Sequence, residues 1–283
     1  NAPAAPVTST TVDFPVLNLS LTATGLLNIT NEQTGEATLG ISHTTVENGK
    51  AVRAITSNGK HYLLDTAHIA GSGYPAEDYI EGFSAEDKPI IALIGDLEAN
   101  VLLVTRKGMV KKIAPDAYAK RQGLPAIALA DGDEVIAAFV VSEDETVLLV
   151  TSNGKALRIE LTKIAPKGRT SIGVAGMKLT EADVILAANT VTDNTVVATI
   201  TSAHNHKAVS ASEIPVKGRA TGGVALHAMR KGEVGLQAAA IADSALYAST
   251  DDGSEHETMP EVTPKTQAGK PLAEKFSVIT ASA

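Results

Sequence analysis

VLLVTSNGKALRI, residues 147–159, consists of two apolar runs joined by Asn153-Gly154. The central residues of a tight hairpin need positive φ, which Asn and Gly adopt most easily. The stretch therefore predicts two antiparallel strands joined by a short turn. The same pattern occurs earlier, with Gly59 and Gly108 at the turns, in AVRAITSNGKHYLL (residues 51–64) and VLLVTRKGMVKKI (residues 101–113).

The hairpin belongs to an internal repeat. TSNGKALRI from Thr151 aligns without gaps on TSAHNHKAV from Thr201, and GRTSIGV from Gly168 aligns on GRATGGV from Gly218. Both pairs have the same offset of 50 residues (201 − 151 and 218 − 168). Two separate segments that share one offset indicate a repeat architecture rather than chance similarity.

Weaker copies turn at Gly25 and Gly253, so six units are predicted. Each full unit contains an apolar hairpin, a loop with Gly-Arg or its equivalent, a short strand, an acidic turn and a last apolar strand. Four strands per unit predict an all-β, six-bladed, propeller-like ring of four-stranded antiparallel sheets, each buried against its neighbours. The units begin near Val16, Ala51, Val101, Val147, Val196 and Ala245.

Both ends of the chain depart from this unit. The distance from Gly25 to Gly59 is only 34 residues, so one strand or its long loop must be abbreviated in the first unit. The last unit has no clear acidic turn, but it ends in the strand-like FSVIT (residues 276–280), which is expected to close the ring with the N-terminal segment. Residues 1–12 are small and rich in Pro and Ala. We expect them to form a flexible leader before a single domain at residues 13–283.

The composition indicates a globular core of aliphatic side chains. Hydrophobic residues make up 44% of the chain and aromatic residues only 3%, with no Trp. No apolar run approaches the ~20 residues of a membrane helix, and the N-terminus carries no charged-then-apolar secretory signal. The absence of Cys excludes disulfides and thiolate metal sites. These features predict a cytoplasmic protein without membrane contact.

The net charge of −8 is unevenly distributed. Residues 1–100 carry 4 basic and 12 acidic side chains, and residues 231–283 carry 4 basic and 8 acidic ones. Residues 101–230 carry 16 basic and 12 acidic side chains, a balance of +4. A polyanion is therefore expected to meet the middle units and not the ends of the chain.

Twelve basic side chains of the middle units form the candidate polyanion site. Most lie beside glycine turns, where glycine exposes backbone N–H groups and the side chain supplies charge for a phosphate. The alternative is that they merely solubilise an all-β surface, because the local balance is modest. No base-reading pattern is present, so binding is predicted to be largely independent of sequence and strongly dependent on salt. The set consists of Arg106, Lys107, Lys111, Lys112, Lys120, Arg121, Lys155, Arg158, Lys167, Arg169, Lys217 and Arg219.

Signatures of catalysis or metal binding are missing from the sequence. It contains no GxxxxGK[ST], GxSxG or HExxH, so no cofactor and no enzymatic activity are predicted for this chain. His204 and His206 flank a predicted hairpin tip without a third ligand at a recognisable spacing, which favours solvated side chains over a metal site. A propeller enzyme with a site in the central channel is disfavoured because the inner strands are uniformly aliphatic.

The units resemble the repeats of the C-terminal domain of the DNA gyrase and topoisomerase IV A subunits. The residues that carry the resemblance are the two VLLVT hairpins, KGRTSIGVAGMKL (residues 167–179), and AKRQGLPAIAL with the following DGDEVIAAFVV (residues 119–141). It is clear from about Ala51 to Ala240 and faint at both ends. The resemblance implies a six-bladed β-pinwheel in which adjacent blades exchange strands, and DNA that bends around the outer rim.

One departure from gyrase bears on function. The first blade of gyrase carries a wrapping motif of the form Gln-Arg-Arg-Gly-Gly-Lys-Gly. Nothing between Gly25 and Gly59 matches it, and the nearest stretch, Gln33 to Gly40, has no basic residue. Lys120-Arg-Gln-Gly123 matches part of this motif but has no double glycine. A topoisomerase IV-like or diverged paralogous protein is therefore favoured over a gyrase-like wrapping one.

The leading hypothesis is a monomeric disc that binds double-stranded DNA on a basic arc formed by the third to fifth units. The resemblance implies that it presents this DNA to a separate catalytic domain. Its partners would then be the other domains of the topoisomerase A subunit, together with an ATPase B subunit. The acidic first and last units are expected not to hold DNA, so the wrap would be partial. The rival hypothesis is a propeller that serves as a protein-interaction scaffold, which the overall acidity favours.

Overall fold

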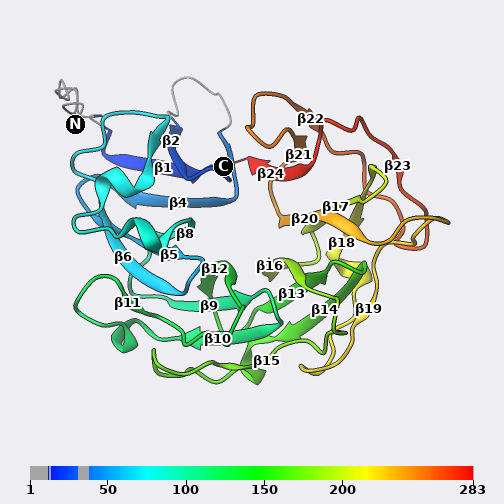
Figure 1. Ribbon diagram of the computed structural model, residues 1–283, viewed down its shortest axis with the longest axis horizontal. Helices are drawn as coiled ribbons and strands as arrows, with labels where there is room; N and C mark the ends of the chain where they lie inside the picture. Colours follow the sequence, from blue (N-terminus) through cyan, green and yellow to red (C-terminus); the bar gives the residue numbers. More distant parts are fainter. Residues whose placement is uncertain (1–11, 13, 31–37, 283) are drawn as a thin grey trace.

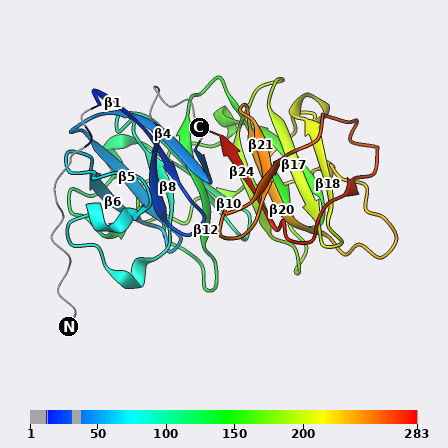
Figure 2. The same cartoon turned by 90° about the horizontal axis from the view of Figure 1, so that it is seen from above.

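The computed structural model describes residues 12, 14–30 and 38–282. These residues form six four-stranded antiparallel sheets, here called blades 1–6 in the chain order of their hairpins. The blades follow one another around a ring (Figure 1), and Figure 2 shows the same ring edge-on as a disc. The predicted all-β class and the six-bladed ring are confirmed.

Blades 1–3 are each given in the spatial order of their strands. They are β4 (Ser42–Glu47), β1 (Val16–Leu21), β2 (Leu26–Thr30) and β7 (Tyr74–Pro75); β8 (Ile90–Ile94), β5 (Ala51–Thr56), β6 (Lys60–Asp65) and β11 (Leu124–Pro125); and β12 (Val135–Val141), β9 (Asn100–Thr105), β10 (Met109–Ile113) and β15 (Val174–Ala175).

Blades 4–6 follow the same convention. They are β16 (Ile185–Val191), β13 (Thr146–Thr151), β14 (Lys155–Glu160) and β19 (Val224–Ala225); β20 (Leu236–Ala242), β17 (Val196–Thr201), β18 (Asn205–Ser210) and β23 (Lys270–Pro271); and β22 (His256–Thr258), β21 (Leu246–Ser249), β24 (Val278–Ser282) and β3 (Leu39–Gly40). Short 3₁₀ helices occur at η1 (Ala76–Tyr79), η2 (Ala85–Asp87), η3 (Pro115–Ala117), η4 (Leu161–Lys163) and η5 (Ala211–Glu213). The hairpins begin at or within one residue of the predicted unit starts.

Adjacent blades exchange their outermost strands. The strand β15 lies between β14 and β16 in the chain, yet it pairs with β10 of the preceding blade, with Met109 opposite Ala175. The strands β7, β11, β19 and β23 join the preceding blades in the same way. A loop that leads into an exchanged strand therefore lies on the blade before the one to which its own hairpin belongs.

The apolar character of both faces of each hairpin follows from this stacking. In β13, Val147 and Leu149 pack into the core between blades 3 and 4, while Leu148 and Val150 pack into the core between blades 4 and 5. Alternate side chains of a strand point to opposite faces, so a strand buried on both faces must be apolar throughout. The inner strands β4, β8, β12, β16, β20 and β24 line a central channel.

The ring closes between the two ends of the chain, as predicted. The strand β24, which begins two residues after Phe276, pairs with β3, so that Ala281 lies opposite Gly40. The Nε2 atom of His43 lies 3.0 Å from the carbonyl oxygen of Ala281 and adds a second link. The abbreviated part of the first unit is the connection between β2 and β4, which covers residues 31–41. Apart from Val12, the predicted leader at residues 1–12 lies outside the described residues.

Gly173, directly before the exchanged strand β15, leaves no space for a side chain. Its φ is +92°, and an added Cβ would lie 2.4 Å from the carbonyl oxygen of Val110. Gly173→Ala is therefore expected to lower the free energy of unfolding by about 2–4 kcal/mol, measured by urea denaturation. In the same loop, Gly168→Ala is the control, because its Cβ would meet nothing within 4 Å. Similar losses from the two changes would contradict this account of the exchange.

Candidate nucleic-acid interface

Three basic loops occupy equivalent positions on successive blades. They cover residues 119–123, 166–173 and 216–223, and each leads into an exchanged strand: β11 on blade 2, β15 on blade 3 and β19 on blade 4. The second loop is fixed to β10, because the Lys167 amide donates to the Lys112 carbonyl oxygen at 2.8 Å. The third is fixed to β14 in the same way, since the Lys217 amide donates to the Arg158 carbonyl oxygen at 2.8 Å. Strand exchange thus places the basic loops of the third to fifth units on the rims of blades 2–4.

The cationic groups of these loops, together with that of Lys155 at the start of β14, are available to a ligand on the rim. Exposed side chains are those of Lys120, Arg121, Lys155, Lys167, Lys217 and Arg219, while Arg169 is partly buried. Among the described residues, none of these seven forms an ion pair. Arg219 is held by a hydrogen bond from its Nη1 to the Ala175 carbonyl oxygen at 3.0 Å. These seven residues are called the basic band below.

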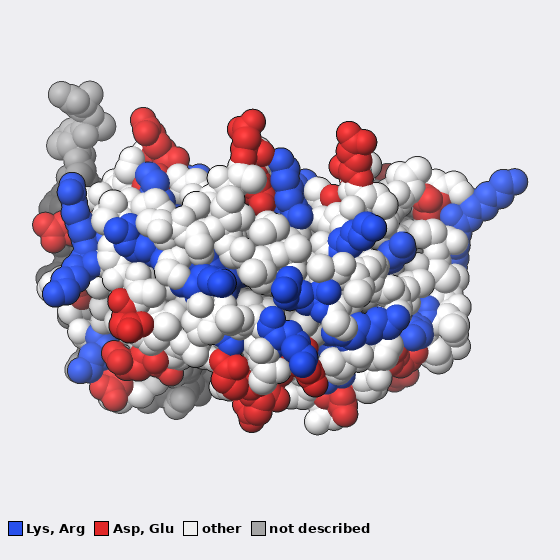
Figure 3. Space-filling view, turned by 90° about the horizontal axis from the view of Figure 1, so that it is seen from below, with Lys and Arg blue, Asp and Glu red and all other residues white. Residues whose placement is uncertain are grey.

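The charges on the rim are segregated. Figure 3 shows Lys and Arg side chains running across the middle of the rim, with Asp and Glu side chains gathered along its two borders. Acidic turns explain the borders, because residues 131–134 precede β12 and residues 143–145 follow it, at opposite ends of the strand. The same arrangement recurs around β16, with Glu181 before the strand and Asp193 after it. A polyanion on this rim is thus confined to the band between two rows of carboxylates.

The structure places two predicted site residues, Lys111 and Lys112, in the interior. The side chain of Lys111 is 0% exposed, and its Nζ donates to the carbonyl oxygens of Ala126 at 2.7 Å and Ser171 at 3.1 Å. Burial lowers its pKa to about 8. Lys112 is 2% exposed and bonds to Glu143 and to the Leu161 carbonyl oxygen. The expectation that they face a ligand is corrected, because the strand that carries them is covered by a blade on each face.

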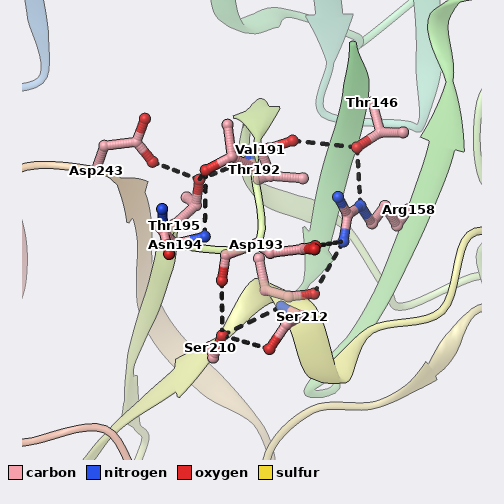
Figure 4. Close-up of polar contacts among 11 residues, drawn as sticks. Thr146, Arg158, Val191, Thr192, Asp193, Asn194, Thr195, Ser210, Ser212 and Asp243 are labelled. Atoms are coloured by element: carbon pink, nitrogen blue, oxygen red, sulfur yellow. Dashed lines mark hydrogen bonds and ion pairs between the residues drawn. The ribbon is translucent and has the colours of Figure 1, made fainter.

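Arg158 is also engaged within the protein, as Figure 4 shows. Its Nε donates to the Thr146 hydroxyl at 2.8 Å, and its Nη1 lies 3.1 Å from the Asp193 carboxylate. The side chain is 12% exposed. The Ser210 hydroxyl donates to the Asp193 carbonyl oxygen, which fixes the turn that holds this carboxylate. Arg158 therefore supports the rim, and its charge is largely neutralised.

Arg106 and Lys107 lie at an acidic border and not in the basic band. Arg106 pairs with Glu134 at 3.2 Å, and both side chains are about half exposed. The Lys107 Nζ donates to the Asp131 carbonyl oxygen at 2.6 Å, and its amide donates to Asp133 at 2.9 Å. The prediction that these two residues belong to one site with the loops is not supported by this placement.

One cation was missed by reasoning from the sequence. Lys178 is exposed, and its amide donates to the Thr221 carbonyl oxygen at 2.9 Å, beside the third basic loop. The signal was present, because Lys178 lies within KGRTSIGVAGMKL. It was overlooked because it follows the loop by several residues, and only strand exchange brings the two segments together.

Among the described residues, His204 and His206 are not part of any group of three or more potential His, Asp or Glu ligands. His204 is at the hairpin tip with a φ of 56°, where the aligned residue of the preceding unit is Gly154.

The stretch from Gln33 to Gly40 was compared with the wrapping motif of gyrase. Its residues 33–37 lie outside the described residues. No helix among the described residues has the length and apolarity needed to cross a membrane.

Comparison with known proteins identifies the repeats. The family model described as DNA gyrase C-terminal domain, beta-propeller, matches residues 99–142, 145–192 and 207–241. The A subunit of DNA gyrase from Chlamydia pneumoniae is 33% identical over 125 residues, which cover 42% of this chain and 15% of that protein. The corresponding protein of Deinococcus deserti is 40% identical over 79 residues, 27% of this chain and 10% of that protein. The chain thus matches only a small part of the length of these relatives.

The ring is also shared with solved structures. The C-terminal domain of DNA topoisomerase IV superposes with a TM-score of 0.76 at 20% identity, covering 95% of this chain and 94% of that one. The DNA gyrase A C-terminal domain superposes with a TM-score of 0.69 at 19% identity, covering 94% and 97%. These likenesses concern the fold, and the sequence matches concern the repeats. The three matched segments thus belong to the family of DNA gyrase C-terminal, beta-propeller domains, and the ring as a whole has the fold of these solved domains.

Proposed function

We propose that this chain binds double-stranded DNA along the basic band, as the C-terminal domain of a type IIA topoisomerase A subunit. The observation that carries the proposal is the basic band itself: equivalent cationic loops on three successive blades, without carboxylate partners among the described residues. A convex rim with charges repeated blade by blade follows the backbone of a duplex that bends around it. Lys and Arg beside Gly168 and Gly218 supply charge and accessible backbone N–H groups for phosphates.

The arrangement favours non-specific binding over base reading. The cations lie on loops and at the start of β14, and the helices of the described residues are 3₁₀ turns of three or four residues, too short to enter a major groove. Binding would therefore depend on phosphate charge and on the ease of bending the duplex. The acidic borders would repel a duplex that leaves the band. The duplex would therefore wrap only part of the rim, over blades 2–4. The parent enzyme would be of the topoisomerase IV-like kind.

The catalytic step belongs to other parts of the parent enzyme in this proposal. The domain would bend the duplex and present it to a separate DNA-cleaving domain of the A subunit, and the partner of both would be an ATPase B subunit. By itself it would be a monomer without cofactor or enzymatic activity, acting on DNA in the cytoplasm. The matched relatives are A subunits of DNA gyrase, which supports this assignment.

A salt series with linear duplex DNA tests the proposal. With about five to seven phosphates neutralised, the logarithm of the association constant should fall with the logarithm of the salt concentration at a slope between about −4.5 and −6.3. Two duplexes of unrelated sequence should bind with affinities within about threefold of each other. Absence of binding at low salt, or a nearly flat salt dependence, would contradict DNA binding and favour the protein-interaction scaffold.

A further inference from the structure

The seam between blades 2 and 3 contains polar side chains where the next two seams are apolar. The hairpins align on Thr56, Thr105 and Thr151, each of which precedes the turn glycine by three residues. On this alignment three positions inside the seams differ in kind from one seam to the next. They are Arg53 against Leu102 and Leu148, His61 against Val110 and Ala156, and Tyr118 against Ile164 and Ile214.

In the other two seams these positions form ordinary hydrophobic cores. Leu102, Val110 and Ile164 belong to the core between blades 3 and 4, and the aligned residues of the following seam belong to the core between blades 4 and 5. Burial of polar groups costs free energy unless they are hydrogen-bonded. The apolar alternative at these positions is thus available to the fold, and the polar set of the seam between blades 2 and 3 needs a separate explanation.

The three polar side chains contact one another. The guanidinium carbon of Arg53 lies 3.5 Å from the centroid of the Tyr118 ring, and the rings of His61 and Tyr118 meet edge to face at 5.1 Å. The Nη1 of Arg53 lies 3.4 Å from Nδ1 of His61. Because Nδ1 accepts from the guanidinium, the proton of the neutral imidazole is on Nε2. Arg53 and His61 are 8% and 2% exposed, and Tyr118 is partly buried.

The seam presents donors without an acceptor. The Nε2 of His61 and the hydroxyl of Tyr118 are buried and have no hydrogen-bond partner among the described residues. Within the same part of the chain, no carboxylate pairs with Arg53. The cation–π contact covers one face of the guanidinium. Most of its N–H groups point outward in the plane of the group and have no acceptor among the described residues. An oxyanion is the ligand that such a set would bind.

The surroundings are cationic and lie beneath the basic band. The Gly123 amide of the first basic loop donates to the His61 carbonyl oxygen at 2.9 Å, and Leu124 of β11 pairs with His61. Burial, together with the nearby charges of Arg53 and Arg169, lowers the pKa of His61 to about 4. Burial also raises the pKa of Tyr118 to about 12. Both groups therefore remain hydrogen-bond donors near neutral pH.

We propose that the seam between blades 2 and 3 is a site for one phosphodiester group. The Arg53 guanidinium, the Nε2–H of His61 and the Tyr118 hydroxyl would donate to its non-bridging oxygens. This inference deepens the proposed function, because the group would come from the backbone of the bound duplex. It adds a fixed point between the first two basic loops at which the register of the duplex on the rim is set.

Nuclear magnetic resonance with dimethyl phosphate tests the site, since this probe is a phosphodiester without sugar or base. Saturable changes are expected at the ring signals of His61, with a rise in the pKa of His61 by about one unit as the anion binds. Tyr118→Phe keeps the ring under the guanidinium and removes one donor, so it should weaken binding of the probe by about tenfold. Arg53→Leu installs the residue of the aligned positions and should abolish binding while the domain stays folded.

Tyr74→Phe is the matched control, because Tyr74 is 50% exposed on β7 of another blade. It should leave binding of dimethyl phosphate unchanged. Equal effects of the two tyrosine changes, or no saturable change at His61, would overturn the site. Methyl phosphate distinguishes the source: a seam that takes only this monoester would bind a strand end or a free phosphate and not the backbone. Normal duplex binding by Arg53→Leu and Tyr118→Phe would contradict the phosphodiester site but leave the proposed function intact. Binding of dimethyl phosphate without binding of duplex DNA would support the site and contradict the proposed function.

Discussion

Changing Lys167, Lys217 and Arg219 together to glutamate is expected to lower the affinity for linear duplex DNA by two to three orders of magnitude at about 0.1 M salt. Each phosphate contact contributes close to one power of ten in the association constant at this salt concentration, through the release of a counterion. The three side chains are exposed and lie on two of the three basic loops. Their reversal removes contacts and adds repulsion. A gel shift or fluorescence anisotropy with the same duplex measures the loss, and the salt slope should become shallower by about three.

A control with the same change of net charge separates the band from the overall charge of the domain. Lys50, Lys88 and Lys275 are exposed and lie on units 1, 2 and 6, outside the three loops. Lys88 pairs with the partly exposed Glu77 and Lys275 with the exposed Glu255, and ion pairs at the surface contribute little to stability. The triple change of these lysines to glutamate should lower the affinity by less than about tenfold. If both triple variants lost affinity equally, DNA would be responding to net charge and the basic band would not be its site.

Most of the ring could be predicted from the sequence because its determinants are local. Turn glycines such as Gly59 and Gly108 need positive φ, and the two apolar runs beside each of them leave little alternative to a hairpin. The similar spacing between copies from the second unit onward then required these hairpins to have the same surroundings. Only a closed stack of blades gives six such hairpins the same apolar neighbours on both faces.

The candidate site was predicted less well because its determinants are not local. Lys111 and Lys112 are adjacent in β10, and in a strand with one solvated face one of the two would be exposed. Here each face of β10 is covered by a neighbouring blade, so both side chains are buried. Strand exchange had a second effect, because it shifted every basic loop to the preceding blade and brought Lys178 beside Thr221. Counts of charged residues along the chain show neither the burial of both faces of β10 nor the shift of the loops by strand exchange.

The buried role of Lys111 predicts a loss of stability that is independent of DNA. Lys111→Glu would place a carboxylate against the carbonyl oxygens of Ala126 and Ser171, with the lysine that now satisfies them removed. An unpaired buried charge of this kind costs about 3–5 kcal/mol. This is a large share of the 5–15 kcal/mol that typically stabilises a domain. The midpoint of thermal unfolding should fall by roughly 10 °C or more, measured by circular dichroism.

Two further variants show why this loss would arise from burial. Lys111→Met keeps the apolar stem and removes the donor without adding a charge, so it should cost only about 1–3 kcal/mol. Lys167→Glu reverses an exposed charge on the loop that Lys111 holds, and should change stability by less than about 0.5 kcal/mol. If Lys111→Glu were as stable as Lys167→Glu, the side chain would have to reach solvent, and it would return to the set of possible phosphate ligands. The expected order instead assigns the two lysines different tasks: Lys111 anchors the loop from inside, and Lys167 displays its charge on the rim. A lost gel shift in a Lys111 variant would then report an unfolded ring, so DNA-binding variants of this domain must be chosen among side chains that the blades leave exposed.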